Sequence, residues 1–182
     1  IKLMTRTYPG MIDHSIEYFT KDGEAFKIKD GHVILFHQDS HPELEQILWS
    51  EPDLEPTLSK MCAGNYDQML LKLADCRFGG LNFEPDFTNG IATHDHLECP
   101  LRGSCIGENI VCKPIEINGQ PVSENEISIL RECATNHKNL AIADHLNIPL
   151  GTLNVSKTRI YEKFGFVTKQ QSTATLFEKG LL

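Results

Sequence analysis

Apolar residues recur at helical spacing in the last third of the chain, where the sequence predicts four short helices. The first helix begins with Ser123 and, three residues later, Glu126, which together have the pattern of a capping box. The apolar residues that then share one helix face are Ile127, Leu130, Cys133 and Ala134. We expect this helix to end at Asn136, because asparagine tolerates the left-handed backbone found after many helix C-termini.

Two more helices follow, and a short turn separates them. The inward-facing residues predicted for the second helix are Leu140, Ile142, Ala143 and Leu146. After a turn at 147–151, residues 152–164 form the third helix, whose apolar stripe is Leu153, Ile160 and Phe164. Two helices joined in this way have the pattern of a helix-turn-helix, whose second helix lies in the major groove of DNA while the first crosses the backbone.

The polar face of the third helix carries side chains suited to reading DNA. Asparagine can pair with adenine, arginine with guanine, and a valine or threonine methyl group can contact the thymine methyl group. The candidate DNA-binding residues on this helix are Thr152, Asn154, Val155, Lys157, Thr158, Arg159 and Lys163. Lys138 and Asn139, at the start of the preceding helix, are candidates for phosphate contacts.

Residues 122–172 resemble the DNA-binding domain of LuxR-type (GerE-like) regulators. The positions that carry the resemblance are Val122, Ser123, Glu126, Ala134, Asn136, Asn139, Ile142, Ala143, Ile148, Thr152, Leu153, Ile160, Lys163, Phe164 and Phe166. The chain differs where this family commonly has lysine (Asn154) and histidine (Ser156), and where some members have lysine (Thr158). The resemblance implies a four-helix domain that binds double-stranded DNA, and a homodimer that binds palindromic operators.

Short apolar runs separated by Asp-Gly pairs predict β-strands near the N-terminus. The predicted strands are 16–20, 25–28 and 32–37, with turns at Asp22-Gly23 and Asp30-Gly31. His32 and His37 frame the last strand, and we expect both at the surface rather than as metal ligands.

The pattern becomes helical between residues 42 and 78. The apolar faces expected there comprise Leu44, Ile47, Leu48 and Trp49, then Leu58 and Met61, and finally Met69, Leu70, Leu73 and Cys76. Asn65 is the predicted N-cap of the last of these helices, and Gly79-Gly80 its end. We interpret these faces as core, although they would equally suit a dimer surface.

The segment 81–114 has almost no helical or strand periodicity, and a loop of this length inside a compact domain needs something to hold it. We expect a structural zinc ion bound by Cys76, Cys99, Cys105 and Cys112, because a closed zinc site needs four ligands and prefers thiolates. Should one of these point elsewhere, the reserve ligands are Cys62, His94 and His96. Free thiols, a disulfide and a four-iron four-sulfur cluster remain alternatives. Cys133 is expected in the core.

The charge and the short motifs of the chain exclude fewer classes of function than the helical pattern does. The chain has a formal net charge of -8, whereas residues 119–182 alone carry seven Lys/Arg against six Asp/Glu. A catalytic metal site at His94 and His96, beside Asp95 and Glu98, is conceivable, but the chain lacks a phosphate-binding loop, a nucleophile elbow and an HExxH motif. We therefore predict no enzyme. With no long apolar run and no leader pattern, we expect a cytoplasmic protein and no membrane partner.

Together these patterns predict an α+β protein with two parts. Residues 1–114 would form an N-terminal domain of hairpin and helices with the cysteine-bearing loop 81–114, and 115–121 a linker. Residues 122–182 would form the all-α DNA-binding domain of a transcriptional regulator, with its recognition helix at 152–164. The alternative function is a protein-interaction module, or a metal or redox sensor, that keeps the helix-turn-helix fold without strong DNA binding.

Overall fold

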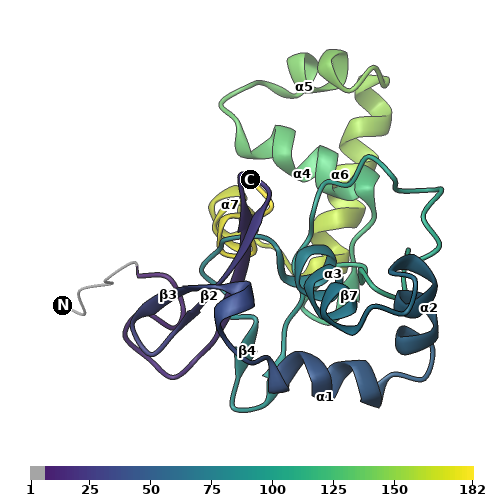
Figure 1. Ribbon diagram of the computed structural model, residues 1–182. Coiled ribbons are helices and arrows are strands. Elements are labelled where there is room, and N and C mark those ends of the chain that lie inside the picture. Colours follow the sequence, from purple (N-terminus) through teal and green to yellow (C-terminus); the bar gives the residue numbers. More distant parts are fainter. Residues whose placement is uncertain (1–6) are drawn as a thin grey trace. The chain divides into compact units, whose positions relative to one another are not determined.

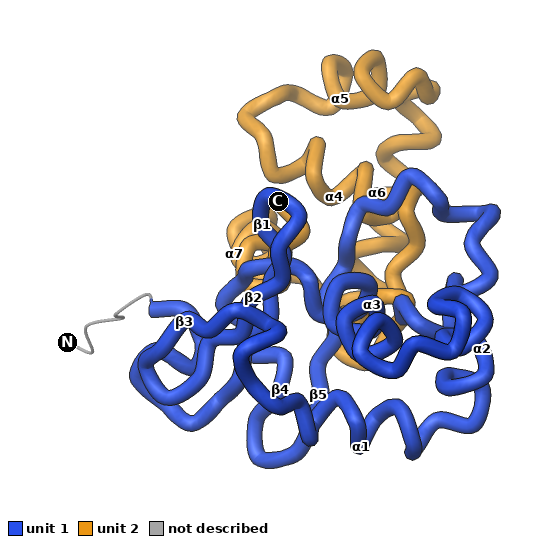
Figure 2. Tube along the Cα trace, in the orientation of Figure 1, with its two compact units in different colours: residues 1–113 blue, residues 114–182 orange. Residues whose placement is uncertain are grey.

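The computed structural model describes residues 7–182, which contain helices and small sheets, so the predicted α+β class is confirmed (Figure 1). The chain divides into two compact units, Ile1–Lys113 and Pro114–Leu182 (Figure 2). Residues 1–6, the start of the predicted N-terminal domain, lie outside the described residues. No helix in the described part of the chain combines the length and the apolar character needed to cross a membrane.

The first unit begins with an antiparallel meander, as the Asp-Gly pattern predicts. Its strands are β1 (Glu17–Lys21), β2 (Glu24–Lys29) and β3 (His32–Leu35), paired in that order. Asp22 (φ 53°) and Gly23 (φ 81°) both adopt the left-handed backbone that a two-residue hairpin turn requires. The predicted third strand is too long, because Phe36 turns inward and stacks on His41 with ring centroids 3.7 Å apart. His32 and His37 are exposed, as predicted.

Three helices cover the core of this unit. They are α1 (Pro42–Ser50), α2 (Leu54–Met61) and α3 (Tyr66–Phe78), and a small hairpin of β4 (Phe87–Thr88) and β5 (Ile91–Ala92) follows. Asn65 caps α3 as predicted, because its side chain accepts the backbone N–H of Gln68. The inward position predicted for Trp49 is wrong. This residue is 65% exposed, because Leu44 and Leu48 occupy the buried face of α1 one turn apart.

Two charged side chains of the meander are fully buried, which the sequence pattern did not indicate. The ammonium group of Lys27 lies 2.7 Å from Glu43 and 3.0 Å from Asp39, and donates to the carbonyl of Ser40 at 2.9 Å. Glu17 instead accepts two backbone N–H groups of the loop that follows α3. Both side chains therefore join the sheet to segments distant in sequence.

The second unit contains the four helices that the sequence predicts. They are α4 (Glu124–Ala134), α5 (Asn139–His145), α6 (Leu150–Phe164) and α7 (Lys169–Glu178). The stretch 115–121, predicted as a linker, belongs to this unit. It forms the hairpin β6 (Glu116–Ile117) and β7 (Gln120–Pro121) around Asn118-Gly119, and Ile115 and Ile117 are buried in the core with α4 and α6.

Three local predictions for this unit need correction. The helix α6 begins at Leu150 rather than Thr152, because Pro149 adopts the extended N-cap conformation. Leu140 faces solvent and is 61% exposed, whereas Ile142 and Ala143 are buried as predicted. Asn136 does not end α4 with a left-handed residue: the extended Thr135 ends it, and its hydroxyl donates to the carbonyl of Glu132 at 2.7 Å.

Candidate nucleic-acid interface and cysteine cavity

The apolar stripe of α6 determines which of its side chains can meet DNA. Leu153, Ile160 and Phe164 are at most 3% exposed, because they pack into the two cores of the unit. The opposite face is therefore outward. The predicted DNA-binding residues that are exposed on it are Thr152, Asn154, Val155, Thr158, Arg159 and Lys163, while Lys157 is half-buried.

A small polar network joins the start of α5 to α6. The side-chain amide of Asn139 donates to Asn154 Oδ1 at 3.0 Å, and Lys157 Nζ donates to Asn139 Oδ1 at 2.8 Å. Asn139, a candidate phosphate contact, thus donates one hydrogen bond to Asn154, which is predicted to read a base, and accepts one from Lys157. The structure brings these three predicted residues together across the two helices of the helix-turn-helix.

The cationic side chains near the outward face of α6 differ in whether they form ion pairs within the protein. Within residues 7–182, the side chains of Arg159 and Lys138 make no hydrogen bond or ion pair. Lys163 instead donates to both carboxylate oxygens of Glu126 at 2.8 Å. Burial alone would raise the pKa of Glu126, but hydrogen bonds from Lys163 and Ser123 lower it below its usual range. Lys163 could contact DNA only by leaving this ion pair.

Glu126 is also part of the predicted capping box, which is present. Its Oε2 accepts the backbone N–H of Ser123 at 2.9 Å, and the hydroxyl of Ser123 accepts the backbone N–H of Glu126 at 3.3 Å. The first turn of α4 and the last turn of α6 are therefore tied through one carboxylate. Cys133, further along α4, is buried as predicted.

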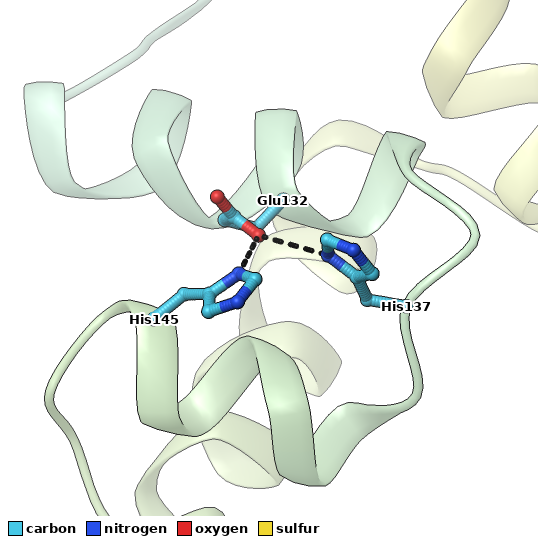
Figure 3. A group of neighbouring side chains, drawn as sticks. All are labelled: Glu132, His137 and His145. Carbon is cyan, nitrogen blue, oxygen red and sulfur yellow. Dashed lines mark hydrogen bonds and ion pairs between the residues drawn. The ribbon is translucent and has the colours of Figure 1, made fainter.

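Three side chains that the sequence did not single out meet at the junction of α4 and α5 (Figure 3). His145 Nδ1 lies 3.2 Å and His137 Nδ1 3.8 Å from the same carboxylate oxygen of Glu132. Their ligand atoms all lie within 4.8 Å of one another. Two imidazoles and a carboxylate can bind a divalent metal ion, and the exposure of both histidines makes this a surface group.

In the first unit, the four predicted metal ligands line one cavity of about 330 Å³. Cys76 comes from α3, and Cys99, Cys105 and Cys112 from the loop that follows it, so the loop returns to the end of the helix. All six cysteines of the chain are free thiols. The reserve ligands Cys62, His94 and His96 do not line the cavity. Burial raises the pKa of Cys76 to about 11, so as a free thiol it is protonated and unreactive at neutral pH.

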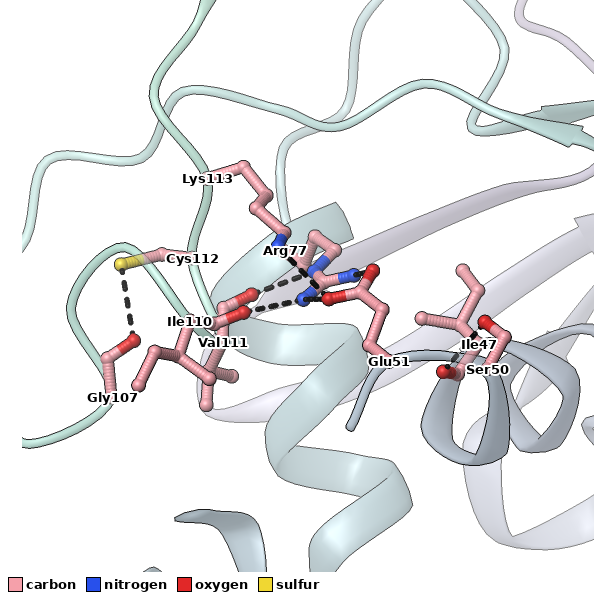
Figure 4. A network of polar contacts seen from close by, with 9 residues as sticks. All are labelled: Ile47, Ser50, Glu51, Arg77, Gly107, Ile110, Val111, Cys112 and Lys113. Carbon is pink, nitrogen blue, oxygen red and sulfur yellow. Dashed lines mark hydrogen bonds and ion pairs between the residues drawn. The ribbon is translucent and has the colours of Figure 1, made fainter. Parts of the chain in front are cut away.

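Arg77, the residue after Cys76, holds the returning loop in place (Figure 4). Its guanidinium donates to the carbonyls of Val111 at 2.7 Å and Ile110 at 2.6 Å, and to both carboxylate oxygens of Glu51 at 2.7 and 3.1 Å. Lys113 also contacts Glu51, at 2.9 Å. The clamp joins α3 to the segment that carries Cys112. The sequence reasoning missed it, because no local pattern pairs an arginine with carbonyls 33 and 34 residues away.

Comparison with known families identifies the second unit. Residues 120–176 match the family described as "Bacterial regulatory proteins, luxR family" (GerE). The predicted resemblance is therefore confirmed: the C-terminal part of the chain is a LuxR-family helix-turn-helix domain. A domain of this family marks the chain as a DNA-binding regulator in general terms. No curated protein and no solved structure matches the chain.

Proposed function

We propose that this protein regulates transcription as a homodimer that inserts α6 into the major groove of double-stranded DNA. The observation that carries the proposal is the outward face of α6 within a LuxR-family domain, where Arg159 and Asn154 are exposed. Arginine and asparagine are the side chains that most often recognise guanine and adenine by two hydrogen bonds. A symmetric dimer would place two such helices about one DNA turn apart.

The charge of the second unit limits the affinity of one copy. Residues 119–182 carry a net charge of only +1, and Lys163 is already paired with Glu126. Phosphate contacts supply much of DNA affinity in proportion to the cations engaged. Of the other predicted cations, Lys138 before α5 and Arg159 on α6 are exposed, and Lys157 is half-buried and donates to Asn139. We therefore expect weak binding by a single copy, and a dimer that doubles the number of contacts.

The test is fluorescence anisotropy of labelled duplex DNA with the full chain, titrated at several salt concentrations. Arg159→Ala should weaken binding by roughly 10-fold or more per chain, as expected for a base contact of about 1–3 kcal/mol. Glu162→Gln, on the same outward face, should instead strengthen binding, because it removes a negative charge that faces the phosphates.

A charge-matched control separates a specific contact from a change in net charge. Lys21→Ala removes one positive charge from an exposed position in the first unit, and it should leave the affinity nearly unchanged. If Arg159→Ala and Lys21→Ala have the same small effect, α6 is not the DNA-binding surface. If the wild-type chain binds no duplex even at low salt, the domain acts as a protein-interaction module instead.

A further inference from the structure

The cysteine cavity of the first unit has the composition of a metal site but not the spacing of a zinc site. Four thiolates that bind one zinc ion at about 2.3 Å in a tetrahedron lie about 3.8 Å from one another. Within residues 7–182, the only set of three or more histidine, cysteine or acidic ligand atoms within 4.8 Å of one another is Glu132, His137 and His145. The four cysteines of the cavity do not form such a group.

The size of the cavity also exceeds what a single ion needs. A space of roughly 10–15 Å³ already holds one water molecule, whereas this cavity measures about 330 Å³. Its wall between the cysteines is formed in part by Met61, Leu97 and Val111. Such a space, with thiols around it and apolar side chains between them, suits a ligand of several atoms that each thiolate approaches from a different side.

The backbone around the cavity is held closely enough to position those thiols. The N–H of Gly107 donates to the sulfur of Cys105 at 3.3 Å, and the thiol of Cys112 lies 3.9 Å from the carbonyl of Gly107. A side chain at Gly107 would meet the sulfur of Met61 at 2.9 Å, so Met61 would have to move to make room for it. The Arg77 clamp holds the carbonyls of Ile110 and Val111, just before Cys112. Amide contacts to sulfur are typical around protein-bound clusters.

We propose that Cys76, Cys99, Cys105 and Cys112 bind an iron–sulfur cluster in this cavity. Both common cluster types take four cysteine thiolates and distribute them over several iron atoms, which spreads the sulfurs more widely than one zinc ion does. On binding, each of the four thiols exchanges its proton for an iron–sulfur bond, and four protons are released. The proposal concerns the first unit alone and holds whether or not the second unit binds DNA.

The experiment uses the full chain, purified without oxygen, reconstituted with ferric iron, sulfide and a thiol reductant, and then desalted. Iron, acid-labile sulfide and zinc are measured per chain, together with the visible absorption spectrum and the electron paramagnetic resonance spectrum after reduction. We expect equal amounts of iron and labile sulfide, a brown colour and a paramagnetic signal of the reduced cluster. About one zinc ion per chain without labile sulfide would overturn the proposal, as would the absence of any retained metal.

Variants assign the ligands. Cys99→Ser is the first choice, because Cys99 is exposed and its replacement disturbs the core least. Cys99→Ser should lower the iron retained per chain by more than about tenfold. Replacing residues that only support the ligands of a metal site already lowers metal affinity by about tenfold or more. The matched control is Cys62→Ser, whose thiol only donates to the carbonyl of Gln68 at 3.4 Å. It should keep the iron. Equal iron in both variants would show that the cysteines of the cavity are not the ligands.

The surface histidines need a control of their own, because they can bind loose metal. The double variant His137→Ala and His145→Ala removes both imidazoles of that group. It should retain the cluster and its spectrum. Loss of the cluster in this variant, with the far-ultraviolet circular dichroism unchanged, would place the iron in the second unit and overturn the assignment.

Discussion

The buried carboxyl group of Glu17 should make the first unit less stable as the pH rises above neutrality. Glu17 is 0% exposed, and its two oxygens accept the backbone N–H groups of Asn82 at 2.9 Å and Asp86 at 3.3 Å. Burial raises the pKa of Glu17 from 4.5 to about 9, despite these hydrogen bonds, and the nearby carboxylate of Asp95 adds to the effect. The folded state therefore holds a proton that the unfolded chain has already lost.

The direction and size of this pH effect follow from the difference in proton binding between the folded and unfolded states. Between the unfolded pKa of 4.5 and the folded pKa of about 9, each pH unit removes about 1.4 kcal/mol from the free energy of unfolding per such proton. The stabilisation is complete below pH 4.5 and lost as the pH approaches 9. Burial lowers the pKa of His41 from its ordinary value of 6.5. This shift reduces stability only as the pH falls below 6.5, so it does not oppose the effect of Glu17 at higher pH. From about pH 6.5 to 8.5, Glu17 alone accounts for up to about 3 kcal/mol.

The assay is urea unfolding at several pH values from about 6.5 to 8.5, followed by fluorescence. Trp49 is the only tryptophan of the chain, so the signal reports the first unit. Glu17→Gln should reduce the pH slope by about 1.4 kcal/mol per pH unit. Glu24→Gln, at an exposed position of β2, should leave it unchanged. A wild-type stability that stays constant or rises over this range, or an equal slope in Glu17→Gln, would refute the reasoning.

Three further substitutions test other parts of the structure. Lys27→Met should cost about 3–5 kcal/mol in urea unfolding, because it leaves Glu43 buried without its cation; a cost below about 1 kcal/mol would contradict the buried ion pair. Ser123→Ala should lower the stability of the second unit by about 1 kcal/mol in thermal circular dichroism, since the box with Glu126 is broken. Arg77→Lys should lower the iron retained after reconstitution by roughly 10-fold, because lysine has three N–H donors on one atom and cannot replace the planar guanidinium that contacts two carbonyls and both carboxylate oxygens of Glu51. If Arg77→Lys retains as much iron as the wild-type chain, the Arg77 clamp is not needed for metal binding in the cavity.

The helices and strands that the sequence predicts correctly are those whose signal is contained in a few consecutive residues. Ser123 and Glu126 indicated the start of α4 because a capping box is complete within four residues. Asp22-Gly23 indicated the first hairpin in the same way. Asn118-Gly119 carries the same hairpin signal, but its flanking strands are only two residues long, too short for a pattern that distinguishes a hairpin from a linker.

Contacts between distant residues could not be predicted in this way. The four cysteines were grouped by residue type alone, whereas the Arg77 clamp that brings their loop back depends on the tertiary structure. Lys27 and Glu17 lie in strands where the pattern does not distinguish a solvated charge from a buried one. On α6, the sequence indicated the outward face correctly. It could not show that Lys163 is paired with Glu126, 37 residues away.

The most direct test of the central claim is selection of duplex DNA from a random pool by the full chain, followed by hydroxyl-radical footprinting of the selected sequence. We predict enrichment of a symmetric site whose two protected half-sites lie about 10 base pairs apart. At the lowest concentration of wild-type chain that protects the site, Arg159→Ala should leave it unprotected, because the variant binds more weakly by roughly 10-fold or more per chain. A pool that remains random after repeated selection at low salt, with no protected positions, would contradict the account of this protein as a DNA-binding regulator.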